Sequence, residues 1–189
     1  MSYQSLPISI SILDFWFAAE TQPFWFMKDP NFDETIRKRF GKTYEDAVSE
    51  FEKGKFGDIK MGKDALEFVI ILDQFSRNMF RDTPKAFATD ELALTISKMA
   101  VEKGLDRELS DSVHYNFLYM PYMHSEKLED QEEGIRLFSL IPGNEMTVSY
   151  ARQHRDIIAK FGRFPHRNKI LGRDSTPEEH VFLKEFLGF

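Results

Sequence analysis

The chain contains no cysteine among its 189 residues. This absence excludes disulfides, thiolate zinc sites and a cysteine nucleophile, and it fits a reducing compartment. The first twenty residues lack the basic segment of a signal peptide and carry Asp14 in their apolar part. No other run approaches the length of unbroken apolar sequence that a membrane span needs. We therefore expect a cytoplasmic protein without a membrane partner.

Several enzyme signatures are also missing. The sequence has no serine in a nucleophile-elbow pattern, no glycine-rich Walker or dinucleotide loop, and no His-Glu-x-x-His segment. The net charge of −6 argues against a general nucleic-acid binder. These absences predict neither a cofactor nor a nucleic-acid partner, and they leave open whether the protein is an enzyme.

Apolar residues are plentiful and helically spaced. Hydrophobic residues make up 42% of the chain, including 19 phenylalanines, which is enough for a sizeable core. Successive segments place them three and four residues apart, and no convincing pair of alternating strands appears. We predict an all-α fold, a single domain over residues 1–189 in which antiparallel helix pairs are joined by short turns.

Cap and turn residues set the expected helix ends. Asn31 or Asp33 is the predicted cap of a helix from 34 to about 53, which Gly41 is expected to divide. Asp90 is the predicted cap of a helix that runs through Glu102. Pro121 is expected to kink or end the helix that follows. The other predicted helices lie at 8–17, 66–81, 110–120, 126–140, 145–161 and 176–187.

The stretch from Leu66 to Arg81 is the predicted centre of the fold. It is apolar on every side for two turns, which is typical of a buried helix. Gln74, Arg77, Asn78 and Arg81 then follow at the spacing of one helical face. Asp73 and Arg77 are expected to form an ion pair within the helix. The helix should leave the core at its C-terminal end and present a row of donors there.

A second donor-rich segment runs from Phe161 to Arg173, with four cations and no acid. Arginine offers a planar fork that matches carboxylate or phosphate. The segment predicts an anion site formed by Arg163, His166, Arg167, Asn168 and Arg173. The alternative is that these arginines pair with acids of the same chain, such as Asp73, Glu126 or Asp174.

Histidines and acids supply candidates for acid–base chemistry. His124, Glu126 and His166 are the candidate catalytic groups, because arginines near them would stabilise negative charge. His124, Glu126, His154 and His166 are also metal-ligand types, but their spacing is sparse and the surrounding cations oppose a divalent ion, so no metal site is predicted. His154 lies on an apolar face, and we interpret it as a hydrogen-bonded core histidine.

Four motifs in order carry a family resemblance, namely Asp14 to Phe17, Leu72 to Arg81, Pro121 to Glu126, and Phe161 to Asn168 followed by Leu171 to Glu179. Together they resemble the bacterial domain of unknown function 924 family over nearly the whole chain. The resemblance implies an all-helical fold with tetratricopeptide-repeat-like superhelical packing, and it implies no established activity. Ser76 stands where the family motif is expected to read proline, which should leave the helix less kinked.

Two functional hypotheses follow. In the first, the chain binds a small anionic molecule or a peptide carboxylate in a basic pocket. The predicted pocket residues are Gln74, Arg77, Asn78, Arg81, His124, Arg163, His166, Arg167, Asn168 and Arg173. In the second, the chain is a helical interaction scaffold whose motif arginines form internal ion pairs. The first hypothesis requires three distant segments to converge on one cavity.

Overall fold

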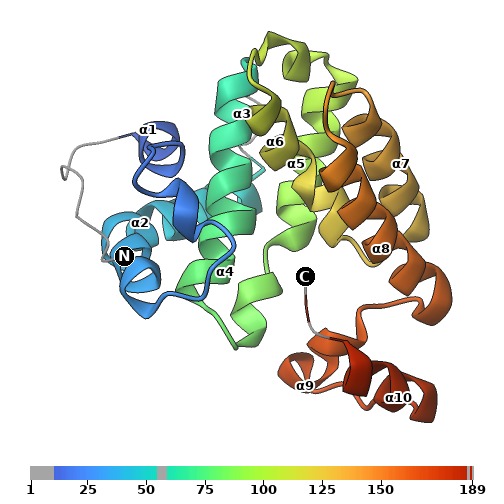
Figure 1. The fold of residues 1–189 in the computed structure, drawn as a ribbon. Helices are drawn as coiled ribbons and strands as arrows, with labels where there is room; N and C mark the ends of the chain where they lie inside the picture. Colours follow the sequence, from blue (N-terminus) through green and yellow to red (C-terminus); the bar gives the residue numbers. More distant parts are fainter. Residues whose placement is uncertain (1–10, 55–58, 187, 189) are drawn as a thin grey trace.

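The computed structural model describes residues 11–54, 59–186 and 188, and it confirms the all-α fold (Figure 1). Within those residues every regular element is helical, and no helix is both long and apolar enough to cross a bilayer. The α-helices are α1 (Ile12–Trp16), α2 (Pro30–Glu52), α3 (Gly62–Val69), α4 (Ser76–Met79), α5 (Asp90–Glu102), α6 (Ser112–His124), α7 (Leu128–Ser139), α8 (Glu145–Phe161), α9 (Asn168–Leu171) and α10 (Pro177–Glu185). The other helical segments are η1 (Gln22–Phe24), η3 (Ile70–Phe75), η4 (Pro84–Phe87), η5 (Leu105–Glu108) and η6 (Pro165–Arg167).

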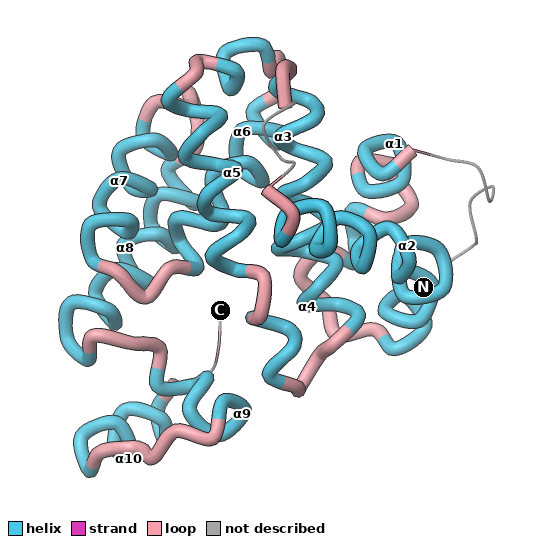
Figure 2. Tube along the Cα trace, turned by 180° about the vertical axis from the view of Figure 1, so that it is seen from behind, coloured by secondary structure: helices cyan, strands magenta, loops and turns pink. Residues whose placement is uncertain are grey.

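A continuous rod formed by α3, η3 and α4 runs through the middle of the molecule. Most of its apolar side chains are buried, as the sequence predicted, including Leu66, Ile70, Leu72 and Phe75, whereas Phe68 is partly buried. Around it, α2 packs on η3 and α4, α5 packs on α3, and α6, α7 and α8 follow as a stack in which each helix packs on the next. Figures 1 and 2 show this stack on one side of the rod and α2 on the other.

The middle of the rod, η3, is a π-helix. A π-turn leaves backbone carbonyls without their usual helical N–H partners, so other donors are needed. Ser76 Oγ donates to the carbonyls of Leu72 and Asp73, at 2.8 and 3.0 Å. Thr89, just before α5, also donates to Leu72 O, and Arg77 donates to Asp73 O. The π-turn therefore draws the start of α5 and the Arg77 side chain against the rod.

The apolar residues form two clusters. The larger one joins side chains from α1 through α8, with Trp16, Phe15 and Phe75 among its fully buried members. The smaller one consists of Ile157, Ile158 and Phe164, and Phe161, Phe182 and Phe186 pack against it. It holds η6, α9 and α10 to the end of α8. Figures 1 and 2 show α9 and α10 set apart from the helix stack.

Several predicted helix ends are wrong in detail. Asp29, rather than Asn31 or Asp33, caps α2, because its carboxylate accepts hydrogen bonds from the backbone N–H groups of Asn31 and Phe32. Gly41 does not divide this helix, which is continuous from Pro30 to Glu52. A glycine inside a helix weakens it by only about 1 kcal/mol, less than the packing of the buried α2 face contributes.

Other predicted ends can be compared directly. Pro121 does not end the helix near Met120, since α6 continues to His124 and buries Tyr122 and Met123 after the proline. In the helix predicted at 176–187, Val181 is 60% exposed, and Leu187 lies outside the described residues. Two predicted ends are confirmed. Gly162 closes α8 in the left-handed conformation, and Thr176 forms a capping box at the start of α10.

Candidate functional site

The C-terminal end of the rod meets the end of α6 through a buried carboxylate. Asp73 lies in η3 and is fully buried. Its Oδ1 is 2.7 Å from Nδ1 of His124 and 2.9 Å from Nη1 of Arg77, and its Oδ2 accepts a hydrogen bond from Gln74 at 2.5 Å. The predicted ion pair of Asp73 with Arg77 is therefore present, and the same carboxylate also holds His124.

The C-terminal segment joins this cluster through Asp90. Arg77 places two nitrogens on the Asp90 carboxylate, at 2.9 and 3.0 Å. Arg167 of η6 donates to Asp90 Oδ2 at 3.3 Å and to the backbone carbonyl of His124 at 3.1 Å. Five side chains from η3, α4, α5, α6 and η6 thus form one polar network: Asp73, Arg77, Asp90, His124 and Arg167.

Two rings enclose the guanidinium of Arg167. Its Cζ lies 4.7 Å from the ring centroid of Phe87 and 4.6 Å from that of Phe164. A cation between two aromatic faces is held by electrostatic attraction to both rings. The Arg167 side chain is only 9% exposed, so its position is set by these rings as well as by its hydrogen bonds.

The surroundings fix the charge states of the network at neutral pH. Burial raises the pKa of Asp73, but Arg77 and His124 outweigh burial and bring it down to about 2. Burial, followed by the Arg77 charge, lowers the pKa of His124, so its imidazole is neutral. Burial lowers the pKa of Arg167 to about 10, which leaves the guanidinium charged. The network therefore contains an ionised Asp73 beside a neutral His124.

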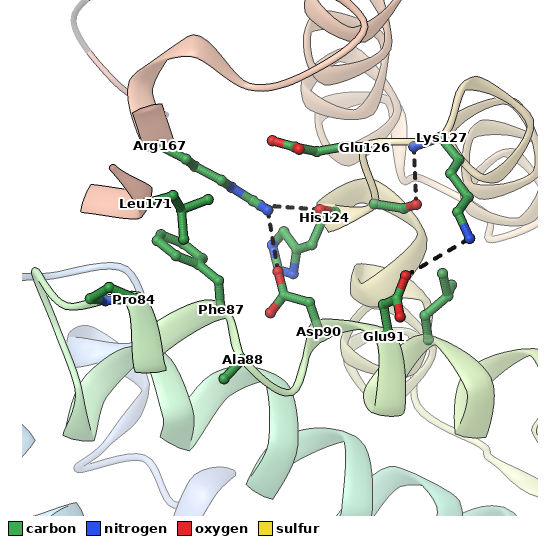
Figure 3. A pocket seen from close by; sticks show the side chains of 12 residues that line it. Pro84, Phe87, Ala88, Asp90, Glu91, His124, Glu126, Lys127, Arg167 and Leu171 are labelled. Atoms are coloured by element: carbon green, nitrogen blue, oxygen red, sulfur yellow. Dashed lines mark hydrogen bonds and ion pairs between the residues drawn. The ribbon is translucent and has the colours of Figure 1, made fainter. Parts of the chain in front are cut away.

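A cavity of about 460 Å³ opens beside this network (Figure 3). Three segments supply its walls: η4 with the start of α5, the loop after α6, and η6 with α9. The lining residues are Pro84, Phe87, Ala88, Asp90, Glu91, Leu94, His124, Ser125, Glu126, Lys127, Arg167 and Leu171. Among them are three acids and two cations, so the charge of the wall is mixed.

The donors predicted along one face of the central helix bind two different neighbouring helices. Arg77 reaches α5, whereas Asn78 and Arg81 bind Asp33 of α2, with distances of 2.7 to 2.9 Å. Consecutive residues of a helix point about 100° apart, so the two edges of one face meet different elements. Gln74 lies behind the network and contacts Asp73 and the sulfur of Met120. The structure therefore does not place Gln74, Asn78 or Arg81 at the cavity.

Glu126 fastens the C-terminal segment to the loop after α6. Both its oxygens accept hydrogen bonds from Arg173, at 2.7 and 3.1 Å, and Oε1 also accepts one from the Phe164 backbone. Burial raises the pKa of Glu126, but these hydrogen bonds leave it below its ordinary value. Arg173 Nε reaches Asn168 Oδ1 at 3.0 Å. The Glu126 carboxylate lines the cavity with both oxygens already engaged.

The remaining predicted residues build the interior of the C-terminal segment. Arg163 binds both oxygens of Glu179, at 2.7 and 2.8 Å, and Asn168 binds the same carboxylate. The ring of His166 packs against those of Phe164 and Phe186, and burial lowers its pKa to about 4. Of the predicted site residues, His124, Glu126 and Arg167 line the cavity. Arg77 lies directly behind them, where it binds Asp90.

The sequence interpretation missed Asp90, Phe87 and Lys127 as parts of the site. Asp90 was interpreted as a helix cap, but the N-cap position is occupied by Thr89, and the Asp90 carboxylate turns to the arginines. Because an acid at the start of a helix is commonly its N-cap, the pairing of Asp90 with arginines could not be inferred from its position. His154 is a core histidine as predicted, with Nδ1 2.8 Å from Tyr150 O. Within the described ranges, no group of three or more potential ligands is placed to hold a metal ion.

The fold and site together define an all-helical protein whose C-terminal segment closes against the end of a buried central helix. The family model for "Bacterial protein of unknown function (DUF924)" matches residues 12–186, and the chain belongs to this family. A solved structure from Agrobacterium tumefaciens, titled as that of the protein of unknown function ATU0120, is 36% identical over 93% of this chain and 96% of the other, with a TM-score of 0.82. No curated protein matches.

Proposed function

We propose that the protein binds a small anionic molecule, or a peptide through its carboxylate, in the cavity beside Arg167. The observation that carries the proposal is how few of the Arg167 donors are used. This nearly buried guanidinium makes two hydrogen bonds, both longer than 3 Å, and its Nε is buried without a partner among the described residues. Buried polar groups are normally satisfied, so an under-used guanidinium at a cavity favours an anionic ligand.

The other arginines of the motifs differ from Arg167 in this respect. Arg173 makes four hydrogen bonds, and Arg163 makes three. Arg77 is engaged by the Asp90 carboxylate and by the backbone of Asp73. Arg167 is therefore the motif arginine that we assign to the ligand.

The remaining wall suits a small molecule with an apolar body. Phe87, Leu94 and Leu171 supply apolar surface, and a volume of about 460 Å³ lies within the usual range for small-molecule pockets. Lys127 stands at the rim, 59% exposed and 3.9 Å from Glu91, so its ammonium group is weakly held. The acids Asp90 and Glu126 are already paired with arginines, so they oppose an incoming anion less than their number suggests.

A second candidate function is a helical interaction scaffold. It is favoured by the internal pairing of most motif arginines, namely Arg77 with Asp90, Arg81 with Asp33, Arg163 with Glu179 and Arg173 with Glu126. In this case the motifs serve to hold the fold together. The tetratricopeptide-like packing that the family resemblance implies would then present a partner peptide to a groove.

Thermal shift measurements separate the two proposals. The probes are acetate, succinate, citrate, inorganic phosphate, and one short peptide with either a free or an amidated C-terminus. Ligand at about 100 times its Kd stabilises a protein by about 2.7 kcal/mol, which is easily detected. We expect a saturable rise in Tm with one class of anion, and loss of that rise in Arg167→Ala.

Arg136→Ala is the matched control, because Arg136 is 55% exposed on α7 and pairs only with Glu133. This variant should respond to the anion as the original chain does. If none of the anions raises the Tm, or if Arg167→Ala responds equally, the ligand site is rejected and the scaffold is favoured.

A further inference from the structure

The pair formed by Asp73 and His124 has the geometry of a carboxylate that orients an imidazole. The Asp73 carboxylate is fully buried, and one of its oxygens is 2.7 Å from Nδ1 of His124. Because an ionised carboxylate can only accept hydrogen bonds, Nδ1 must carry the proton. Since the imidazole is neutral, Nε2 then bears the free lone pair.

Nε2 of His124 is directed to the cavity side. His124 is one of the lining residues, and Figure 3 shows its ring at the cavity wall between Arg167 and Asp90. Nδ1 faces the buried rod, and no hydrogen bond to Nε2 is formed by any described residue. The charged groups around the ring are Asp73 and Arg77 from the rod, Asp90 from α5 and Arg167 from η6.

The nucleophile available to such a base is water. Ser125 supplies a hydroxyl to the cavity lining, but it donates to Asp130 at 2.7 Å and accepts from the Lys127 backbone. It makes no hydrogen bond to His124, so the serine–histidine contact needed to activate a serine nucleophile is absent from this part of the chain. A water beside Nε2 needs no such contact within the protein.

From this geometry we infer that His124 is a general base that activates water to hydrolyse a small ester bearing an anionic group, and that Asp73 is its positioning residue. The inference rests on the proposed function, because Arg167 must hold the anionic group of the ester next to His124. It goes further by naming the reaction, the substrate class and the group that moves the proton.

The proton and electron balance closes with water as the co-reactant. As the water oxygen bonds to the ester carbonyl carbon, Nε2 takes one water proton, and the resulting imidazolium is stabilised by Asp73. The carbonyl electron pair moves to oxygen, and the Arg167 guanidinium, which also binds the anionic group of the ester, stabilises this negative charge by electrostatic attraction. Collapse of this intermediate breaks the bond to the alkoxide, which receives the proton from Nε2. The products are a carboxylic acid and an alcohol, and His124 is regenerated.

The other acid–base candidates fit this role less well. His166 is packed between two phenylalanine rings and does not line the cavity. Glu126 lines it, but both oxygens are bound by Arg173. His154 lies outside the lining, with its Nδ1 bound to a helix carbonyl.

Nitrogen NMR of labelled histidine tests the resting state directly. We expect His124 to be the Nδ1–H tautomer at neutral pH, and Asp73→Asn to bring up the Nε2–H form, while the signals of His154 stay unchanged. Finding His124 in the Nε2–H form in the original chain would overturn the inference. This measurement needs neither a substrate nor a variant that alters the cavity wall.

Hydrolysis of 4-acetoxybenzoate, a small aryl ester that bears a carboxylate for Arg167 to bind, tests the base. General bases contribute about 100-fold or more to rate, so His124→Gln should lose about that factor in kcat/KM, and Asp73→Asn should lose at least about tenfold. His180→Gln, an equivalent change at an exposed position of α10, should hydrolyse the ester as the original chain does. Equal hydrolysis by His124→Gln and the original chain would reject the base.

The two proposals can fail separately. If an anion raises the Tm of both the original chain and His124→Gln while ester hydrolysis is equal in the two, the binding site stands and the general base is wrong. If no anion changes the Tm and no hydrolysis above the uncatalysed rate is seen, both are wrong.

Discussion

Replacing Asp73 with asparagine should destabilise the protein in a pH-dependent way. In the folded chain the pKa of Asp73 lies at about 2, against an ordinary value of 3.8. Each unit of pKa difference corresponds to about 1.4 kcal/mol, so the ionised, paired carboxylate contributes about 2 kcal/mol of stability. Because the folded pKa is the lower one, this contribution is complete above the unfolded pKa and disappears as the pH falls through the folded pKa.

Asparagine resembles the protonated carboxyl group in shape and charge. Asp73→Asn should therefore be about 2 kcal/mol less stable at neutral pH, and the difference should shrink steadily below about pH 4. Breaking a buried ion pair often costs about 3–5 kcal/mol, but here Arg77 keeps its second partner, Asp90, which limits the loss.

Urea unfolding followed by circular dichroism at a series of pH values measures this difference. Asp46→Asn is the control, because Asp46 is 62% exposed and forms only a surface pair with Lys42, so its effect should be close to zero at every pH. A difference between Asp73→Asn and the original chain that stays constant from neutral pH to about pH 3 would refute the linkage reasoning.

Three further substitutions test the packing and capping of the helices. Gly62→Ala should destabilise the chain by about 1–3 kcal/mol, since the new Cβ would lie 2.2 Å from the backbone oxygen of Leu105. Gly41→Ala should instead stabilise α2 by about 0.5–1 kcal/mol, because the new Cβ would meet no neighbouring element within 4 Å. Urea midpoints of the two variants give both signs, and a Gly62→Ala chain as stable as the original would contradict the close contact. Thr176→Ala removes the capping box with Glu179 and should cost about 1 kcal/mol. Hydrogen exchange should rise first at the start of α10, and unchanged protection there would show that the cap contributes nothing.

Local signals were sufficient for much of the fold. The helix from Glu145 to Phe161 was predicted with the observed ends, because its apolar periodicity stops at a glycine that can adopt the left-handed conformation. The burial of the central rod was also predicted, since a helix that is apolar on every side has no face for water.

The parts that the sequence did not predict depend on partners far away in the chain. The π-turn from Ile70 to Phe75 has no local pattern, and its Leu72 carbonyl accepts hydrogen bonds from the adjoining Ser76 and from Thr89, which lies before α5. Spacing placed Arg77 and Arg81 on one face, but which acid each arginine meets depends on how α2 and α5 pack. The sequence interpretation allowed the C-terminal arginines to pair with Asp73, Glu126 or Asp174. In the structure Arg173 pairs with Glu126, whereas the arginine on Asp73 is Arg77 of the rod.

The boundary between the two apolar clusters has a consequence for what holds the walls of the cavity in place. One wall includes Leu94 of the large cluster, and on the other wall Arg167 packs on Phe164 of the small cluster. The connections across this boundary include the hydrogen bonds of Arg167 to Asp90 and His124, and those between Glu126 and Arg173. Hydrogen bonds to charged groups contribute about 1.5–3 kcal/mol each, so these few contacts, rather than a shared apolar core, set the spacing of the two walls.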